Sequence, residues 1–179
     1  MNSQHNTRAL LRRSDGKAST RQCLPCTACC EGWLRIEVNN EEIYPGNGCS
    51  NCEVGKGCRI YEKRPVDPCR SFVCGWREEN SPLPDWLMPN NAKVIVLPNK
   101  FNWQGNPVDV AVPVGKRIPP RALRWLTEYA LKNQRLLVYL EQEITSVELE
   151  KKQLVFAYGP SLFRQEIEVK VREGTSLWL

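Results

Sequence analysis

Nine cysteines fall between residues 23 and 74 of this 179-residue chain, and none follows. Their spacing is C-x2-C-x2-C-C-x18-C-x2-C-x5-C-x10-C-x4-C. A segment of this length buries little apolar surface of its own, so it needs disulfide bonds or bound metal to hold it together. The sulfur atoms therefore constrain the fold of this region more than any other feature of the sequence.

Two features favour metal over disulfide bonds. Residues 1–20 are polar and basic, and their apolar run Ala9-Leu10-Leu11 is shorter than the core of about 7–15 residues that a signal peptide needs. We therefore expect a flexible tail over residues 1–20 and a cytoplasmic protein, in which thiols stay reduced. An odd number of cysteines also fits poorly with complete disulfide pairing. We predict that the metal ligands come from Cys23, Cys26, Cys29, Cys30, Cys49, Cys52, Cys58, Cys69 and Cys74.

Zinc is the first hypothesis for the metal. In each C-x2-C pair, one tight turn aims both sulfurs at the same ion. The pair Cys26 and Cys29 and the pair Cys49 and Cys52 are separated by 19 residues. That separation lies within the window of a four-cysteine zinc site. The spacing indicates metal strongly and leaves open which four cysteines share an ion.

An iron–sulfur cluster is the alternative. Cys23, Cys26 and Cys29 reproduce the first three ligands of a ferredoxin-type run, but the usual fourth position holds no cysteine. The fourth thiolate would then come from farther along the chain, such as Cys69 or Cys74. The predicted cofactor is therefore zinc or iron, the latter including a 4Fe–4S cluster, and the spacing alone does not choose between them.

The adjacent cysteines Cys29 and Cys30 bear on the number of centres. Neighbouring residues in an extended chain point to opposite sides, so these two thiolates are poorly placed to share one ion. We expect them to serve two centres, or one of them to be a buried non-ligand. One spare cysteine leaves eight, which suits two four-ligand centres, and a single centre remains the alternative.

Histidine and charge narrow the functions further. The only histidine is His5, so histidine-ligated zinc sites and Cys–His or Ser–His nucleophile pairs are excluded inside the fold. The formal net charge of +5 counts cysteine as neutral; eight thiolates on two Zn²⁺ ions would bring it to about +1. The basic composition is thus weak evidence for nucleic acid. The chain has no P-loop and no GxGxxG motif, and no catalytic residue beyond the cysteines can be named.

The motif CLPCTACC, which contains the first four cysteines, resembles the YkgJ-like cysteine-cluster family, described as a zinc- or iron-chelating domain. The run from Cys58 through Tyr61 and Arg64-Pro65 to Cys69-Arg70 is similar to that family's C-x-I-Y-x-x-R-P…C-R pattern, with three residues where two are common before Cys69. Cys49, Cys52 and Cys74 look like a subgroup's added ligands. The resemblance covers residues 21–77. A related domain in flagellin lysine methylases is thought to hold an iron–sulfur cluster, so the resemblance implies such a cofactor without implying an activity.

Arg64 lies between two of the proposed ligands and has two interpretations. It can donate hydrogen bonds to cysteine sulfurs and so orient them. Alternatively, its stem packs against Tyr61 while its head meets Glu62 or solvent. The sequence leaves both open.

We predict an α+β fold in which an irregular, metal-nucleated module precedes a small sheet packed on one helix. The expected organisation is a tail (1–20), a cysteine-cluster module (21–77), a linker (78–91) and an α+β unit (92–179). Periodicity predicts strands at 33–38, 92–97, 108–114 (at a sheet edge), 136–140, 145–149, 154–158 and 166–171, a helical turn at 40–44 and a helix from 119 to 133.

These observations predict a cytosolic metal-binding protein that holds zinc or an iron–sulfur cluster on cysteine thiolates. An iron–sulfur enzyme or electron carrier is the first alternative, and a nucleic-acid adaptor of the zinc-ribbon type is the second. The expected partners are a metal ion and a protein; we expect neither nucleic acid nor a membrane, since no run approaches about 20 apolar residues.

Overall fold

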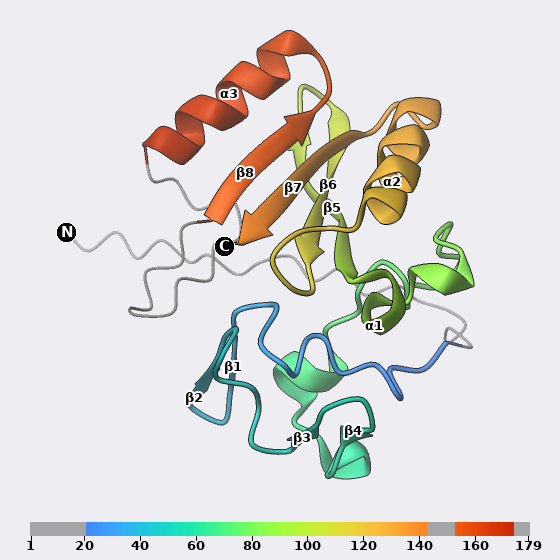
Figure 1. Cartoon of the computed structure of the whole chain (residues 1–179), viewed down its shortest axis with the longest axis vertical. Helices are drawn as coiled ribbons and strands as arrows, with labels where there is room; N and C mark the ends of the chain where they lie inside the picture. The colour runs from blue at the N-terminus through green and yellow to red at the C-terminus, as the bar shows by residue number, and fades with distance from the viewer. Residues whose placement is uncertain (1–20, 143–152, 174–179) are drawn as a thin grey trace, which may run out of the picture.

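The structure, a computed structural model, describes residues 21–142 and 153–173 and has the predicted α+β fold (Figure 1). The strands are β1 (Ile36–Val38), β2 (Glu41–Ile43), β3 (Cys52–Glu53), β4 (Gly57–Cys58), β5 (Val94–Trp103), β6 (Asn106–Pro113), β7 (Leu136–Gln142) and β8 (Gln153–Tyr158). The helices are α1 (Pro89–Ala92), α2 (Pro120–Lys132) and α3 (Ser161–Arg172), with shorter turns η1 (Tyr61–Lys63), η2 (Val66–Arg70) and η3 (Asp85–Leu87). None of the helices in the described ranges has the length and hydrophobicity of a membrane span.

The main sheet has the strand order β5-β6-β7-β8. β5 and β6 form an antiparallel hairpin whose turn residues Gln104 and Gly105 both have positive φ, the backbone that a two-residue type I′ turn requires. β6 and β7 are parallel, so the chain crosses over through α2 between them. β7 and β8 are again antiparallel.

The prediction that residues 108–114 form an edge strand is wrong, because β6 lies inside the sheet with β5 and β7 on either side. Val108, Val110 and Val112 are buried on one face, as expected from the alternation. The intervening Asp109 and Ala111 are buried as well, on the opposite face. The residues between the valines therefore do not face solvent. Ala111 is small, Asp109 forms an ion pair with Arg135, and both are buried.

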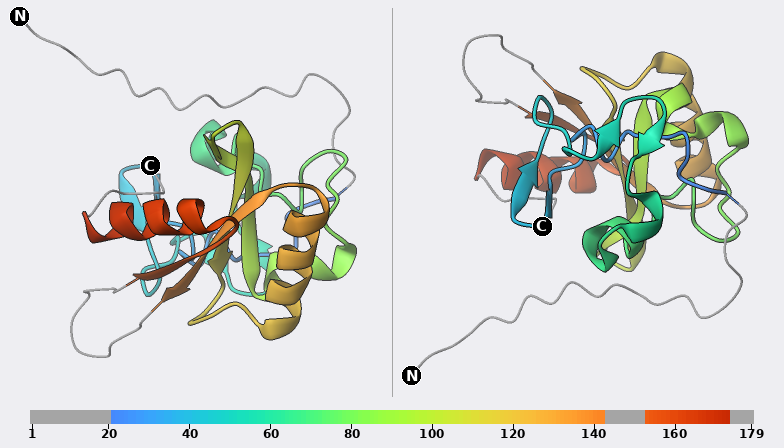
Figure 2. Two further views of the ribbon diagram at one scale, coloured as in Figure 1. Left: turned by 90° about the horizontal axis from the view of Figure 1, so that it is seen from above. Right: turned by 90° about the horizontal axis from the view of Figure 1, so that it is seen from below.

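Two layers cover the sheet. On one face, α2 buries Ala122, Leu126 and Ala130 against strand residues such as Val96 and Leu137. On the other face, α3 buries Phe163 and Ile167, which are four residues apart and lie on one side of the helix. Figure 2 shows the two helices on either side of the strands. The fold thus has two packed helices where the sequence predicted one.

The helix predicted from 119 to 133 is confirmed as α2, with proline in the first turn. Two segments were assigned wrongly. Residues 166–171 belong to α3, and residues 40–44 contain the strand β2 (Glu41–Ile43) instead of a helical turn. The β1–β2 hairpin turns at Asn39 and Asn40, both at positive φ, a conformation that asparagine tolerates. The strand predicted at 145–149 and the tail at 1–20 lie outside the described residues.

The segment predicted as a linker, 78–91, is packed into the core. It contains η3 and most of α1, and its Leu83 and Leu87 are buried with residues of β5 and α2. The indole of Trp76 donates to the Asp85 carbonyl at 3.2 Å. The cysteine-rich region is therefore joined to the sheet by a buried segment, at the lower end of the sheet in Figure 1.

Candidate metal centres

All nine cysteines lie in the described part of the chain as free, half-buried thiols. They come almost entirely from loops and turns. The exceptions are Cys52 and Cys58, which pair across the short β3–β4 hairpin. Figure 1 shows this hairpin and β1–β2 below the main sheet. Because such short strands bury little surface, the positions of the sulfurs depend on local turns and on packing against the sheet.

Four cysteines form the first cysteine set: Cys23, Cys26, Cys29 and Cys74. Burial raises the pKa of Cys29 well above its usual range, and the nearby charges of Cys74 and Cys26 raise it further. Burial likewise raises the pKa of Cys74 to about 11, with Cys26 and Cys23 adding to the effect. Cys26, Cys29 and Cys74 pack against the apolar cluster under α3. The first cysteine set therefore combines three cysteines of the loop at 23–29 with Cys74, which lies in the segment that leads to β5.

Backbone N–H groups point at two sulfurs of the first cysteine set. Burial raises the pKa of Cys26, while hydrogen bonds from the backbone of Ala28 and Asn90 act in the opposite direction. Cys74 receives corresponding bonds from the backbone of Arg77 and Trp76. Bonds donated to sulfur favour the thiolate, which is the form that binds metal.

Five cysteines form the second cysteine set: Cys30, Cys49, Cys52, Cys58 and Cys69. Burial raises the pKa of Cys30 to about 12, and the charges of the other four add to the effect. Burial raises the pKa of Cys52 to about 11, followed by the charges of Glu31, Cys49 and Cys58. The Cys49 N–H donates to the Cys30 carbonyl at 2.8 Å, which brings two distant loops together. Every other cysteine of the set is thus near enough to Cys30 for its charge to raise the pKa of Cys30.

The two sets divide the sequence differently from the simplest zinc pattern. The pairs Cys26–Cys29 and Cys49–Cys52, whose separation suits one four-cysteine site, fall into different sets. The ferredoxin-type run 23, 26 and 29 instead gains Cys74, one of the two distant cysteines named for that position.

Three residues that sequence reasoning missed lie between the sets. Thr27, only 1 % exposed, donates its hydroxyl hydrogen to Glu31 and accepts the Gly55 N–H at 3.2 Å. The Asn90 side-chain oxygen accepts the Thr27 N–H at 3.1 Å and lies 3.3 Å from the Cys26 sulfur. The charge of Glu31 contributes to the raised pKa values of both Cys26 and Cys52. No spacing in the sequence links Asn90 to a cysteine 64 positions away.

Two arginines close to the cysteines in sequence carry buried nitrogens that have no hydrogen-bond partner among the described residues: Nε of Arg64, and Nε and Nη1 of Arg77. The Arg64 guanidinium lies 3.6 Å from the centre of the Tyr61 ring. Burial raises the pKa of Cys69, and the positive charge of Arg64 acts against that rise. Arg64 therefore combines features of both interpretations, since it stacks on Tyr61 and still influences a cysteine of the second set.

The sulfurs in each set are neighbours, but they do not enclose a coordination site. Within residues 21–142 and 153–173, no group of three or more His, Cys, Asp or Glu side chains is arranged to hold a metal ion. The donor chemistry nevertheless fits such an ion, because each set supplies at least four thiols and Arg64 has an unused buried donor nearby. Forming a centre requires the sulfurs of a set to close to about 2.3 Å from a shared ion.

Comparisons with protein families, with curated proteins and with solved structures found no match for this chain. The resemblance of residues 21–77 to the YkgJ-like family therefore stays a prediction.

Proposed function

We propose that this protein is a cytosolic metal-binding protein with two cysteine-ligated centres, one on the first cysteine set and one on the second. The observation that carries the proposal is the division of nine cysteines into a set of four and a set of five, with adjacent Cys29 and Cys30 on either side of the division. Each set then has the four thiolates that a zinc or iron–sulfur centre takes, and one cysteine is spare.

The repulsion between thiolates within each cysteine set favours the binding of a cation. Thiolates gathered in a half-buried place repel one another, which is one reason why burial and neighbouring cysteines together raise the pKa of Cys29 and Cys30. A bound cation replaces this repulsion with attraction and displaces the thiol protons. The two short hairpins and the loops around them would then be held together by metal–sulfur bonds. The orphaned Arg64 Nε would gain a thiolate acceptor in the second set.

An iron–sulfur electron carrier or enzyme is the second candidate, and one observation favours it. Cys23, Cys26 and Cys29 keep the ferredoxin-type spacing, and the structure brings Cys74 beside them. An iron–sulfur cluster on this set would supply one-electron redox chemistry when bound. We place the protein in the cytosol, where thiols remain available as ligands, and we expect its partners to be the metal and another protein.

Metal analysis of the native protein tests the proposal. The full chain is purified without oxygen, its zinc and iron are measured per chain, and its absorption spectrum is recorded. We expect metal at both sets; a colourless protein with about two zinc ions identifies zinc, and absorption near about 400 nm with iron and sulfide identifies a cluster. Protein that carries neither metal, and whose fold is indifferent to chelators, would contradict the proposal.

A further inference from the structure

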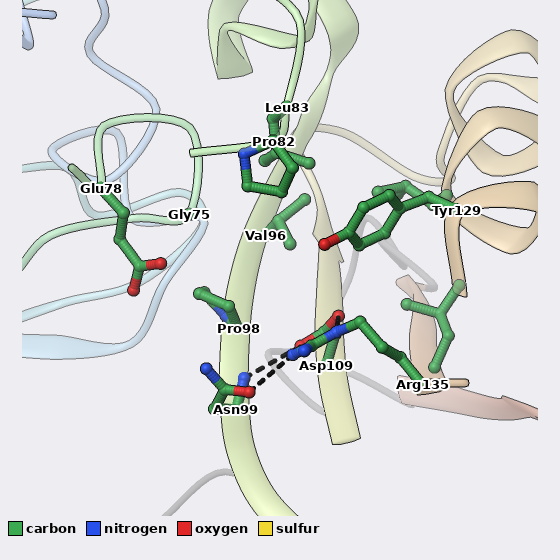
Figure 3. A pocket seen from close by; sticks show the side chains of 12 residues that line it. Gly75, Glu78, Pro82, Leu83, Val96, Pro98, Asn99, Asp109, Tyr129 and Arg135 are labelled. Carbon is green, nitrogen blue, oxygen red and sulfur yellow. Dashed lines mark hydrogen bonds and ion pairs between the residues drawn. The ribbon is translucent and has the colours of Figure 1, made fainter. Parts of the chain in front are cut away.

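A pocket of about 120 Å³ opens between the segment after Cys74, the middle of β5, α2 and the start of β7. Figure 3 shows Glu78 on one side of it and Tyr129, Asp109 and Arg135 on the other. Gly75 also lines the pocket, so the pocket begins one residue after a cysteine of the first set. No sulfur atom lines it, and the inference below does not depend on metal binding.

Two of the three guanidinium nitrogens of Arg135 are engaged by its neighbours. Its Nε donates to Asp109 Oδ2 at 2.7 Å, and its Nη2 lies 2.5 Å from Asp109 Oδ1 and 2.6 Å from Asn99 Oδ1. The irregularity in β5 makes this possible, because the register shifts between Leu97 and Phe101 and turns the Asn99 N–H towards Asp109 at 2.9 Å. Both side chains of the pair are largely buried. The Arg135–Asp109 pair is therefore a fixed wall of the pocket with no net charge.

Glu78 has no such partner. Its carboxylate makes no ion pair or side-chain hydrogen bond with any residue in the described part of the chain, although it lines the same pocket. Burial and the charge of Asp109 raise the pKa of Glu78, and the charge of Arg135 acts against that rise. With both carboxyl groups ionised, Asp109 and Arg135 cancel and Glu78 leaves one negative charge. An anion placed here would meet two carboxylates and an arginine whose donors facing Asp109 and Asn99 are already used.

The remaining walls are apolar and the space is small. Val96, Leu126 and Leu137 contribute hydrocarbon surface. A cavity of about 150 Å³ takes a molecule the size of benzene, so this pocket holds a group of about half a dozen non-hydrogen atoms. Apolar walls with few polar groups that fix orientation are the usual composition of small-molecule sites.

We propose that this pocket binds a small ligand with a cationic nitrogen, a primary alkylammonium group whose charged head pairs with Glu78 while its short alkyl chain lies against Val96, Leu126 and Leu137. The Tyr129 hydroxyl faces the pocket from the side opposite Glu78 in Figure 3 and adds a polar group to its wall. This site is distinct from both cysteine sets and adds a binding activity to the proposed function.

A series of isosteric probes tests the charge requirement on the wild-type chain. Metal-replete protein is titrated with n-butylammonium, 1-butanol and butyrate while its backbone amide resonances are followed by NMR. We expect saturable shifts at Gly75, Asn99 and Tyr129 with n-butylammonium, and binding at least about tenfold weaker for the other two probes. Equal binding of 1-butanol or butyrate, shifts confined to other parts of the molecule, or no saturable shift with n-butylammonium would each overturn the proposal.

A matched pair of variants tests whether Glu78 binds the ammonium group. Glu78→Gln keeps the shape of the side chain and removes its charge, whereas Glu79→Gln removes a neighbouring charge that does not line the pocket. We expect Glu78→Gln to weaken n-butylammonium binding about tenfold and Glu79→Gln to leave it unchanged. Equal losses in both variants, or none in Glu78→Gln, would count against the site. If Glu78→Gln does not fold, the probe series on the wild-type chain still tests whether the pocket binds a cationic ligand. Zinc and iron are measured in every sample, so a failure of metal binding is recognised separately.

Discussion

Cys29 and Cys30 are adjacent in the chain, yet the cysteines whose charges act most strongly on their pKa values differ, although Cys30 also contributes to the raised pKa of Cys29. The charges that raise the pKa of Cys29 come chiefly from Cys74 and Cys26, whereas those that raise the pKa of Cys30 come from the second cysteine set. A single peptide unit therefore separates two groups of thiols. This relationship makes the two proposed centres separable by mutation.

The first prediction concerns that separation. Cys29→Ser removes one proposed ligand from the first set, and Cys30→Ser removes the sulfur whose pKa is raised by the charges of all the others in the second set. We take Cys30 to be a ligand and the spare cysteine to be one of the other four in the second set. We then expect each variant to retain one centre, so the metal content per chain falls by about half if both sets bind zinc. Metal analysis after anaerobic purification measures this. Val54→Ala, on an exposed side chain in the same region, serves as the control. Loss of all metal in both variants, or of none, would contradict the two-centre proposal.

The second prediction concerns Asn90, which ties α1 to the first cysteine set. Asn90→Ala removes the acceptor of the buried Thr27 N–H and the side-chain contact with Cys26. An unsatisfied buried group costs about 1–3 kcal/mol, so we expect a loss of that size in the free energy of unfolding, measured with denaturant on metal-replete protein. Asn91→Ala, one position along and exposed, is the matched control. Equal effects of the two substitutions would show that Asn90 has no special role.

The third prediction uses two glycines at positive φ. A Cβ on Gly32 would lie 2.1 Å from the Tyr44 backbone oxygen, whereas a Cβ on Gly46 would meet nothing within 4 Å. Alanine at Gly46 should cost only the backbone strain, about 1–2 kcal/mol. Alanine at Gly32 adds a clash with the main chain, so we expect a loss of about 3 kcal/mol or more, together with reduced metal content. Similar unfolding free energies for the two variants would show that this close approach does not exist in solution.

The fourth prediction concerns pH. Burial and nearby negative charges raise the pKa of Cys30 to about 12 and those of Cys52 and Cys74 to about 11, from an ordinary value of 9.0. In metal-free protein the folded state holds these protons more tightly than the unfolded state, so its stability is complete below about pH 9 and falls as the pH rises towards 11–12. Denaturant unfolding across this range measures the fall.

Metal reverses that dependence, because binding displaces the thiol protons. We expect the affinity for Zn²⁺ to rise steadily with pH through the neutral range, as measured by competition with a chelator of known affinity. Metal-free protein that grows more stable above pH 9, or Zn²⁺ affinity independent of pH, would show that these thiols are not the ligands.

Part of the fold could be predicted from sequence because its signals are local. The helix α2 follows from proline at its start and a clear apolar stripe, and β7 follows from a run of apolar residues. The helix α3 was missed because Ile167, Val169 and Val171 alternate as in a strand, while the other residue that anchors the helix, Phe163, lies before the segment predicted as a strand. The central place of β6 depends on a pairing with β7 across the whole of α2, and local alternation does not carry that information.

In the candidate site, too, local features could be predicted from the sequence and tertiary ones could not. Cysteine spacing predicts that the thiols gather, and the opposite directions of adjacent side chains predict that Cys29 and Cys30 part; both stay predictions. The membership of each set was not predictable, since it depends on where the chain returns after residue 60 and brings Cys69 to one set and Cys74 to the other. Asn90 and the unpaired Glu78 were invisible for the same reason, because their roles come from tertiary neighbours alone.

Anomalous diffraction from crystals of the metal-loaded protein tests the central claim most directly. Data collected at the zinc or iron absorption edge locate every bound metal independently of the sulfur positions. Two separate peaks are predicted, one about 2.3 Å from the Cys29 sulfur and the other at a similar distance from the Cys30 sulfur. A single peak contacted by both cysteines, or electron density showing the sulfurs joined in S–S bonds, would contradict it.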